Sequence, residues 1–450
     1  MKNYLQLARH EGNSALFDVV EMTVISSKWG VPLHLHAEGL RGTGKTTIMR
    51  AARDIFPRIT RIKGCLYNCD PQRPHCPAHR DLHPDVIAQL ETEEIPMPFL
   101  EISHSAKIGT IVGSIDLAGI TDRTNPTAAI LPGIIPQAHR GIIFIDEINR
   151  LADTSPELTD VLLDVMGTKP GRVQIEETGL PVVEIPVQVS VWAASNPDEE
   201  PGPLQEIRRQ LADRFDLVID MKRTDDPDAI ANILKQASHV RIQEPVNPLD
   251  IQARNIRARK ELEGIARKHA GLDLPDFLRN YIARLYVKYD IESFRAIEAI
   301  QHAALLNCAL RQRDTVLVSD VITVLPLALR HRVDVEVLTR IMNSTPGHSS
   351  TPVNTVSASA GRDDETLAVT DSPEPVPVKE KQSADGKSLV NRMLNTLGLK
   401  KDHDEISFAA ANTQSDLPEV SETPGHPPDL KRISEINLND LIRTDKNLKP

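Results

Sequence analysis

Residues 39–46 have the types and spacing of a phosphate-binding loop. They read G-L-R-G-T-G-K-T, the G-x-x-x-x-G-K-[ST] pattern, after an apolar stretch and before helix-forming residues. Glycines let backbone N–H groups curl around a phosphate, and the N-terminus of the next helix adds positive potential. Lys45 would contact the β- and γ-phosphates of ATP, and Thr46 would ligate Mg²⁺. The predicted nucleotide-binding residues are Gly39, Gly42, Thr43, Gly44, Lys45, Thr46 and Thr47.

Two further apolar stretches end in polar residues suited to nucleotide hydrolysis. The segment "GIIFIDEIN" places Asp146 and Glu147 at the end of a predicted strand, where open α/β sheets bind ligands. Asp146 would hold the magnesium ion with its water shell, and Glu147 would orient or deprotonate the attacking water. The segment "VSVWAASNP" ends in Asn196, whose amide could contact the γ-phosphate.

A cysteine- and histidine-rich loop occupies residues 64–83, "GCLYNCDPQRPHCPAHR" at its start. Cys65, Cys69, Cys76 and His79 could form a structural Zn²⁺ or Fe–S site, with His75 or His83 as substitute ligands. A loop with free thiols and a loop under thiol redox control are the alternatives, and the sequence leaves all three open. Cys308, inside an apolar helical stretch, is expected in the core.

The elements around these residues predict an α/β fold. Residues 1–225 alternate apolar strands with helical stretches, which indicates a parallel sheet flanked by helices. "RITRIKG" is interpreted as the second strand of that sheet, and residues 172–187 as two strands around a glycine. Residues 226–340 are helical in pattern, with Ser319 as a predicted N-cap. Residues 341–450 are rich in Ser, Thr, Pro and Asp, and we expect a mostly disordered tail with short amphipathic helices near 387–400 and 430–444.

The overall composition disfavours nucleic acid as a partner and a location within a membrane. The 450 residues carry a net charge of −11, which disfavours a general electrostatic grip on nucleic acid. No apolar run reaches membrane-spanning length, and the first residues lack the pattern of a secretory signal. We therefore expect a cytoplasmic protein that does not span the membrane.

The order of these motifs resembles the AAA+ ATPases, and more closely the ATPase subunit (I subunit) of magnesium chelatase. The resemblance covers about residues 14–332 and rests on the segments "GLRGTGKTT", "GCLYNCDP", "GSIDL", "LPGIIPQAHRGIIFIDEIN", "LTDVLLDVM", "ASNPDEE", "IRRQLADRFDL" and "LPLALRHR". It implies an AAA+ core followed by an all-helical lid domain, and a family insert at about residues 111–133. It also implies that Asn196 is the first sensor, Arg295 the second sensor, and Arg214 or Arg208 the arginine finger that reaches a neighbouring subunit.

The resemblance also implies a function. The chain would form a homo-oligomeric ring that hydrolyses ATP and drives a partner with a von Willebrand A domain in the insertion of a metal into a tetrapyrrole. A porphyrin-binding chelatase subunit would be a further partner. One alternative is a MoxR-like remodelling ATPase that matures a metalloprotein. An MCM-like DNA-acting ATPase fits less well. The predicted hairpin carries Glu176, Glu177 and Glu184, and these acidic side chains would repel the phosphates of DNA. A scaffold that only binds ATP is disfavoured by Glu147.

Overall fold

The computed structural model describes residues 3–115, 130–167, 169–176, 182–239 and 248–344. The middle of the predicted insert, the turn between the two hairpin strands, and the tail with its predicted helices near 387–400 and 430–444 lie outside these ranges. Among the described residues, no helix combines the length and the apolar composition needed to cross a membrane.

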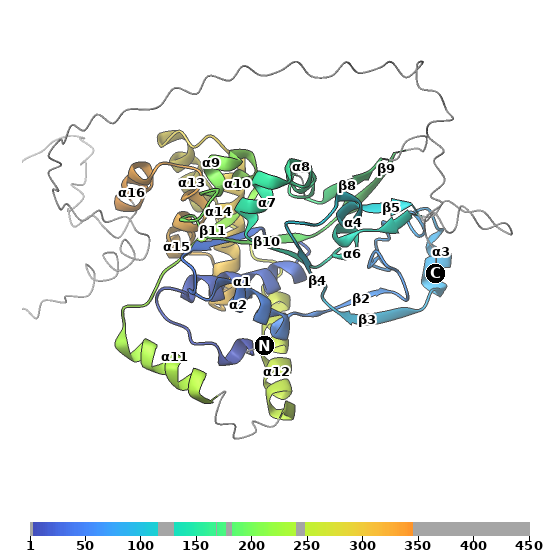
Figure 1. Cartoon of the computed structure of the whole chain (residues 1–450), viewed down its shortest axis with the longest axis horizontal. Helices are drawn as coiled ribbons and strands as arrows, with labels where there is room; N and C mark the ends of the chain where they lie inside the picture. The colour runs from blue at the N-terminus through green and yellow to red at the C-terminus, as the bar shows by residue number, and fades with distance from the viewer. Residues whose placement is uncertain (1–2, 116–129, 168, 177–181, 240–247, 345–450) are drawn as a thin grey trace, which may run out of the picture. The chain divides into compact units, whose positions relative to one another are not determined.

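A five-stranded parallel sheet forms the centre of the N-terminal region, in the order β11-β1-β10-β7-β4 (Figure 1). Its strands are β1 (Leu35–Gly39), β4 (Phe99–Ile102), β7 (Ile142–Asp146), β10 (Ser190–Ser195) and β11 (Leu217–Met221). Every residue of β1 and β10 is buried. Such continuous burial is typical of parallel strands covered on both faces.

Alternate residues of these strands enter two separate hydrophobic cores. On one face, Phe144 of β7 and Trp192 of β10 belong to a core shared with the helices of residues 14–51 and 248–343. On the other face, their neighbours Ile143 and Val191 pack with the helices of residues 148–214. The alternation follows from the two-residue period of a strand, and it confirms the predicted α/β fold with helices on both sides of a parallel sheet.

Three two-stranded antiparallel ladders accompany the main sheet: β2 (Arg58–Ile62) with β3 (Thr92–Pro96), β5 (Gly113–Ile115) with β6 (Ile130–Pro132), and β8 (Gly171–Ile175) with β9 (Val183–Val187). The last of these is the predicted hairpin of residues 172–187. The helices of this region are η1 (Tyr4–Gln6), α1 (Ser14–Lys28), α2 (Lys45–Ala51), η2 (Ala52–Ile55), α3 (Pro84–Gln89), α4 (Ile108–Val112), α6 (Ile134–Gln137), α7 (Ile148–Thr154), α8 (Pro156–Val165), α9 (Leu204–Ile207) and α10 (Arg209–Arg214).

The prediction that "RITRIKG" is the second strand of the main sheet is wrong. β2 pairs with β3 in a ladder of its own, and β4 occupies the sheet position beside β7. Arg58 and Arg61 of β2 form ion pairs with Glu94 and Glu93 of β3. A strand inside the parallel sheet would have to bury both faces, and these charged side chains prevent that.

The described residues from Pro227 to Asn343 are mainly helical, as predicted. The helices are α11 (Pro227–His239), α12 (Pro248–Lys268), α13 (Asp276–Lys288), α14 (Phe294–Leu310), α15 (Val318–Leu329) and α16 (Val335–Asn343). α14 packs against α15 and α13, and α1 of the α/β region packs against α12 and α14. Ser319 is not the N-cap of α15, because the helix begins at Val318 and the buried carboxylate of Asp320 accepts the N–H of Leu317 at 2.9 Å instead.

Candidate functional site

The predicted phosphate loop lies between the carboxyl end of β1 and the start of α2. Gly42 and Gly44 have φ angles of +78° and +89°, and no atom lies within 4 Å of where a Cβ would stand on either. Gly39 has φ +143°, and a Cβ there would lie 2.4 Å from the carbonyl oxygen of Met221 on β11. Glycine therefore serves two needs: backbone conformation at Gly42 and Gly44, and close approach of neighbouring strands at Gly39. The open cradle and its N–H groups at a helix N-terminus fit a phosphate.

The ammonium group of Lys45 is folded back into this loop. Its Nζ donates to the carbonyl oxygens of Gly39 and Leu40, the latter at 2.8 Å, and Thr43 Oγ1 lies at 3.5 Å. Burial lowers the pKa of Lys45, while the nearby carboxylates of Asp146, Glu199 and Asp220 oppose that shift. These carboxylates favour the ammonium form that a phosphate-binding lysine requires.

Thr46 and Asp146 offer oxygen atoms suited to a magnesium ion. Thr46 Oγ1 donates to Asp146 Oδ1 at 3.3 Å, across 100 positions in the sequence. Hydroxyl and carboxylate oxygens are the donors that Mg²⁺ prefers. Arg50 of α2 also contacts Asp146, with 3.4 Å between Nη2 and Oδ2, and it forms a stronger bond to Glu101 of β4 at 2.9 Å. Sequence reasoning did not single out Arg50 or Glu101.

Glu147 and Asn196 follow two neighbouring strands of the sheet at the same edge. Asp146 lies opposite Ala194 in the β7–β10 register, so Glu147, which precedes α7, and Asn196 both lie just beyond that pair. Glu147 has φ +53° and its Oε2 lies 3.1 Å from Arg150 Nη1. The amide of Asn196 donates to Glu199, which also pairs with Arg41 of the phosphate loop. The structure thus brings Lys45, Thr46, Asp146, Glu147 and Asn196 to one edge of the sheet.

A hollow of about 700 Å³ opens beside the phosphate loop. Residues that sequence reasoning missed form most of its wall: Leu7, Ala8, His10, Asn13, Lys222, Arg223, Thr224, Asp225, Ile230 and Ile233. Asn13 fixes the N-terminal segment, because its side chain accepts the N–H of His10 at 2.8 Å and donates to the carbonyl of Ala8 at 3.0 Å. A Cβ on Gly12 would lie 2.3 Å from the Lys222 carbonyl oxygen, so glycine permits the close contact between the two wall segments.

A second hollow, of about 1090 Å³, lies between the α/β region, the start of α14 and the residues that follow α15. Arg214 and Arg295 both line it, and so do Lys169, Arg209, Asp213, Asp216 and Arg332. It shares no lining residue with the hollow beside the phosphate loop. Arg208, the other candidate for the arginine finger, is exposed and does not line it. Burial lowers the pKa of Arg214, and the positive charge of Arg295 lowers it further.

Asp213 and Arg332 connect the two regions across this second hollow. Arg332 Nε donates to Asp213 Oδ1 at 3.0 Å, and its other nitrogens donate to the carbonyl oxygens of Asp213, Phe215 and Ala328. Arg295 Nη1 lies 3.3 Å from Asp213 Oδ2. Burial raises the pKa of Asp213, but the charge and hydrogen bond of Arg332, together with Ser293 and Arg295, outweigh burial and lower the pKa overall. The anion Asp213 therefore helps to position Arg295.

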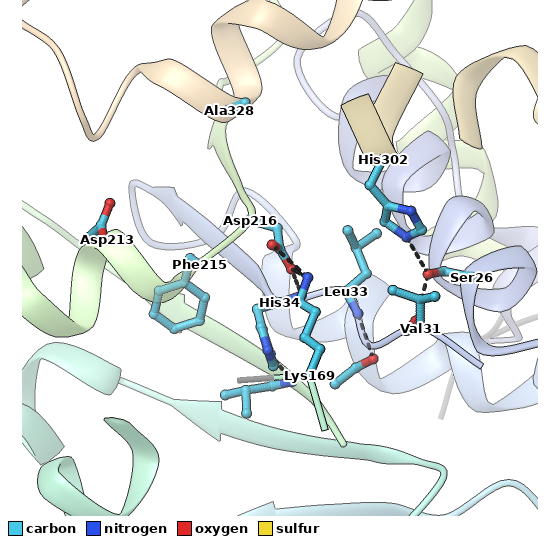
Figure 2. Close-up of polar contacts among 12 residues, drawn as sticks. Ser26, Val31, Leu33, His34, Lys169, Asp213, Phe215, Asp216, His302 and Ala328 are labelled. Atoms are coloured by element: carbon cyan, nitrogen blue, oxygen red, sulfur yellow. Dashed lines mark hydrogen bonds and ion pairs between the residues drawn. The ribbon is translucent and has the colours of Figure 1, made fainter. Parts of the chain in front are cut away.

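Figure 2 shows a second buried carboxylate, Asp216, at the start of β11. It accepts the backbone N–H of His34 at 2.8 Å, and Lys169 Nζ lies 3.0 Å and 3.1 Å from its two oxygens. Burial opposes its ionisation, yet Lys169 and then His34 lower its pKa overall. His34 directly precedes β1, so Asp216 and the second hollow lie at the amino end of that strand, opposite the phosphate loop.

The cysteine loop leaves β2 and packs into the core on the side of Ile143. Cys65, Cys69 and Cys76 are buried, and none of them forms a disulfide. Donor atoms of these cysteines and of His79 all lie within 4.8 Å of one another. His75 Nδ1 lies 3.4 Å from Cys69 Sγ, whereas His83 is exposed and caps α3. Cys308 is buried in α14, as expected.

The parallel sheet with its phosphate loop and the helices that follow it form an AAA+ fold, with a P-loop core and a helical lid. The model of the AAA lid domain family matches residues 279–346. Within this class, comparison with known proteins confirms the resemblance to magnesium chelatase ATPase subunits.

Three relatives illustrate that resemblance. The magnesium-chelatase 38 kDa subunit of Acidiphilium rubrum is 29% identical over 298 residues, which cover 66% of this chain and 82% of that protein. The magnesium-chelatase subunit ChlI of Mesostigma viride is 29% identical over 65% of this chain and 78% of its own length. The ChlI homolog of Methanocaldococcus jannaschii is 28% identical over 65% and 76%. A cryo-EM-based structure of the complex between magnesium chelatase subunits BchI and BchD matches at 20% identity, covering 75% of this chain and 98% of that one, with a TM-score of 0.38.

Proposed function

We propose that this chain hydrolyses Mg²⁺-bound ATP, and that a neighbouring copy completes each active site. The single observation that carries the proposal is the placement of phosphate-loop and arginine residues at opposite ends of β1. From His34 to Gly39 a strand spans about 17 Å at about 3.3 Å per residue. An arginine at the amino end is therefore poorly placed for its own phosphate loop and well placed for that of another copy.

Each residue has a distinct role in the proposed reaction. The loop N–H groups and Lys45 bind the β- and γ-phosphates, while Thr46 and Asp146 hold Mg²⁺, which neutralises the charge of the phosphates. Glu147 accepts a proton from the attacking water or orients it, and the Asn196 amide contacts the γ-phosphate. Arg214, with Arg295 beside it, enters the neighbour's site and stabilises the charge that develops on the transferred phosphoryl group. Asp213 positions Arg295 through their ion pair.

We further propose a ring of such copies as the motor of a metal-inserting enzyme. The relatives are named as subunits of magnesium chelatase, so other subunits complete that enzyme. The output would be insertion of a metal ion into a tetrapyrrole, with a von Willebrand A-domain protein and a porphyrin-binding subunit as partners. ATP-dependent capture of such a protein by the full chain, followed by a porphyrin metallation assay of the captured assembly, tests this step. Capture of a metalloprotein without metallation would favour the remodelling alternative.

The dependence of hydrolysis on assembly tests the ATPase proposal. Phosphate release per chain is measured over a dilution series, and the oligomeric state is followed in parallel by analytical ultracentrifugation with ATP. We expect the rate per chain to fall steeply as the assembly dissociates, since an arginine finger contributes about 10³–10⁵ in rate. An undiminished rate in a demonstrably monomeric sample would contradict the proposal.

A further inference from the structure

The loop between β2 and β3 brings four metal-binding side chains together. The Sγ atoms of Cys65, Cys69 and Cys76 and a ring nitrogen of His79 lie within 4.8 Å of one another. Cys76 Sγ lies 3.1 Å from His79 Nδ1. The three thiols are buried and none is in a disulfide. Three buried thiols and an imidazole at such short range match the donor set of a Cys₃His metal centre.

Backbone groups around the thiols favour a negatively charged sulfur. The N–H groups of His75 and Cys76 both donate to Cys69 Sγ at 3.4 Å, and His75 Nδ1 approaches the same sulfur at 3.4 Å. Hydrogen bonds to the ligand atoms orient metal-binding residues and tune their affinity. The loop therefore provides both the ligands and the groups that support them.

The loop is also held in place from outside, which reduces the entropy lost on binding an ion. Tyr67 Oη donates to the carbonyl of Ile130 at 2.9 Å, and Asn68 Nδ2 donates to that of Gln137 at 2.6 Å. The His75 ring stacks on that of His139 with 3.7 Å between centroids. A metal here would fasten the loop to β6 and α6, the elements on which it packs.

We propose that Cys65, Cys69, Cys76 and His79 bind one Zn²⁺ ion in a structural site. Zn–S bonds of about 2.3 Å in a tetrahedron place the sulfurs about 3.8 Å apart, which the observed ligand spacing allows with small movements. In an Fe–S cluster the protein ligands are divided among two or more irons, so some ligand atoms lie farther apart than they do around a single ion. Four protein ligands leave no position for a reacting water, so the ion is structural.

Metal content and Co²⁺ spectroscopy of the full chain test this inference independently of ATP hydrolysis. We expect about one zinc per chain by elemental analysis, and Co²⁺ exchanged into the site should give thiolate charge-transfer bands and intense tetrahedral d–d bands. Cys76→Ser should weaken the charge-transfer bands by about one third, since one of three thiolates is lost. His79→Ala leaves the thiols intact and should lower metal affinity at least about tenfold, which gives a readout even where a cysteine variant does not fold.

Two control variants sharpen the assignment. Cys308→Ser should keep its zinc, because Cys308 lies in α14 and its thiol donates to the Arg313 carbonyl at 3.2 Å. His75→Ala should also keep zinc, with an altered Co²⁺ spectrum. Absence of zinc together with failure of the apo-protein to bind Co²⁺ would overturn the proposal, as would stoichiometric iron and sulfide. Loss of metal in His75→Ala with retention in His79→Ala would overturn the ligand set.

Discussion

The backbone of Glu147 lies in the left-handed region, at φ +53°, directly after the carboxylate that contacts Thr46. Non-glycine residues adopt this conformation at a cost of about 1–3 kcal/mol and often at functional sites. The turn separates Glu147 from Asp146, so two adjacent carboxylates can serve different purposes. We propose that Asp146 binds the magnesium ion and that Glu147 orients or deprotonates the attacking water.

Exchange of the Glu147 carboxylate for an amide tests this division of roles. Glu147→Gln should keep the affinity for ATP close to that of the wild type and reduce phosphate release about 10²–10⁴-fold, because a general base contributes that much. Nucleotide titration and single-turnover phosphate release measure the two effects separately. A variant with near-normal turnover would remove Glu147 from the reaction.

Substitution of Lys45 should have a different effect, because it should weaken ATP binding and not only slow ATP hydrolysis. Lys45→Ala removes the ammonium that contacts the loop carbonyls and that would contact the phosphates, so ATP affinity should fall at least about tenfold. Lys63→Ala is the matched control, since Lys63 is an exposed lysine that directly follows β2 and pairs with Glu91. Equal nucleotide affinity in the two variants would argue against the predicted phosphate contact.

At the scale of elements, strand β1 separates the two halves of the proposed site. Motif spacing could predict the phosphate loop after β1, the carboxylates after β7 and Asn196 after β10, because each is a local pattern at the end of an apolar strand. It could not predict the wall formed by Leu7–Asn13 and Lys222–Ile233, which carries no motif and arises from tertiary packing. The same limit applies to β2, because its short apolar pattern does not reveal that Arg58 and Arg61 pair with β3.

The two candidate fingers can be distinguished, because only Arg214 lines the second hollow. Arg214→Ala should bind ATP normally and lose at least about 10³-fold in hydrolysis. Arg208→Ala, six positions away and exposed, should hydrolyse ATP at close to the normal rate. Nucleotide titration and steady-state phosphate release on both variants provide the comparison. The reverse result would assign the finger to Arg208.

Asp216 also lines the second hollow, and its substitution should lower the free energy of unfolding. Asp216→Ala leaves the buried N–H of His34 without its acceptor and Lys169 without its partner. We expect the free energy of unfolding to fall by about 1–3 kcal/mol. Chemical denaturation gives this value, and Glu292→Ala, which breaks an exposed pair with Arg209, should change it little. Equal effects would mean that Asp216 has no special structural role.

At the scale of the whole molecule, the lid helices join the α/β region through buried polar contacts as well as through the core. His302 of α14 lies 2.8 Å from the Ser26 hydroxyl of α1. Figure 2 marks this contact with a dashed line. Burial lowers the pKa of His302 to about 4, and it lowers that of His34 to about 4 as well. The helical zone could be predicted from its periodicity, but these contacts could not, because they join residues up to 276 positions apart.

Because the pKa values of His302 and His34 are lowered, the stability of the fold should depend on pH. Their unfolded pKa is about 6.5, so the unfolded chain takes up protons first, and stability present above pH 6.5 is lost as the pH falls toward 4. Each buried histidine contributes at most about 3 kcal/mol to that loss. Denaturation midpoints between pH 7 and 4 should decline less in His302→Gln than in the wild type. His104→Gln, at an exposed site, should follow the wild type. Identical curves for all three proteins would contradict this prediction.

Complementation between two inactive variants tests the shared active site most directly. Arg214→Ala keeps the phosphate loop and Glu147, while Glu147→Gln keeps Arg214. In a mixed assembly, about a quarter of the head-to-tail interfaces would combine both intact parts. We predict that an equimolar mixture recovers about a quarter of the wild-type ATPase activity. The double variant Glu147→Gln/Arg214→Ala should restore activity to neither single variant. A mixture that never exceeds the sum of its separate components, despite proven co-assembly, would contradict an active site completed by a neighbouring copy.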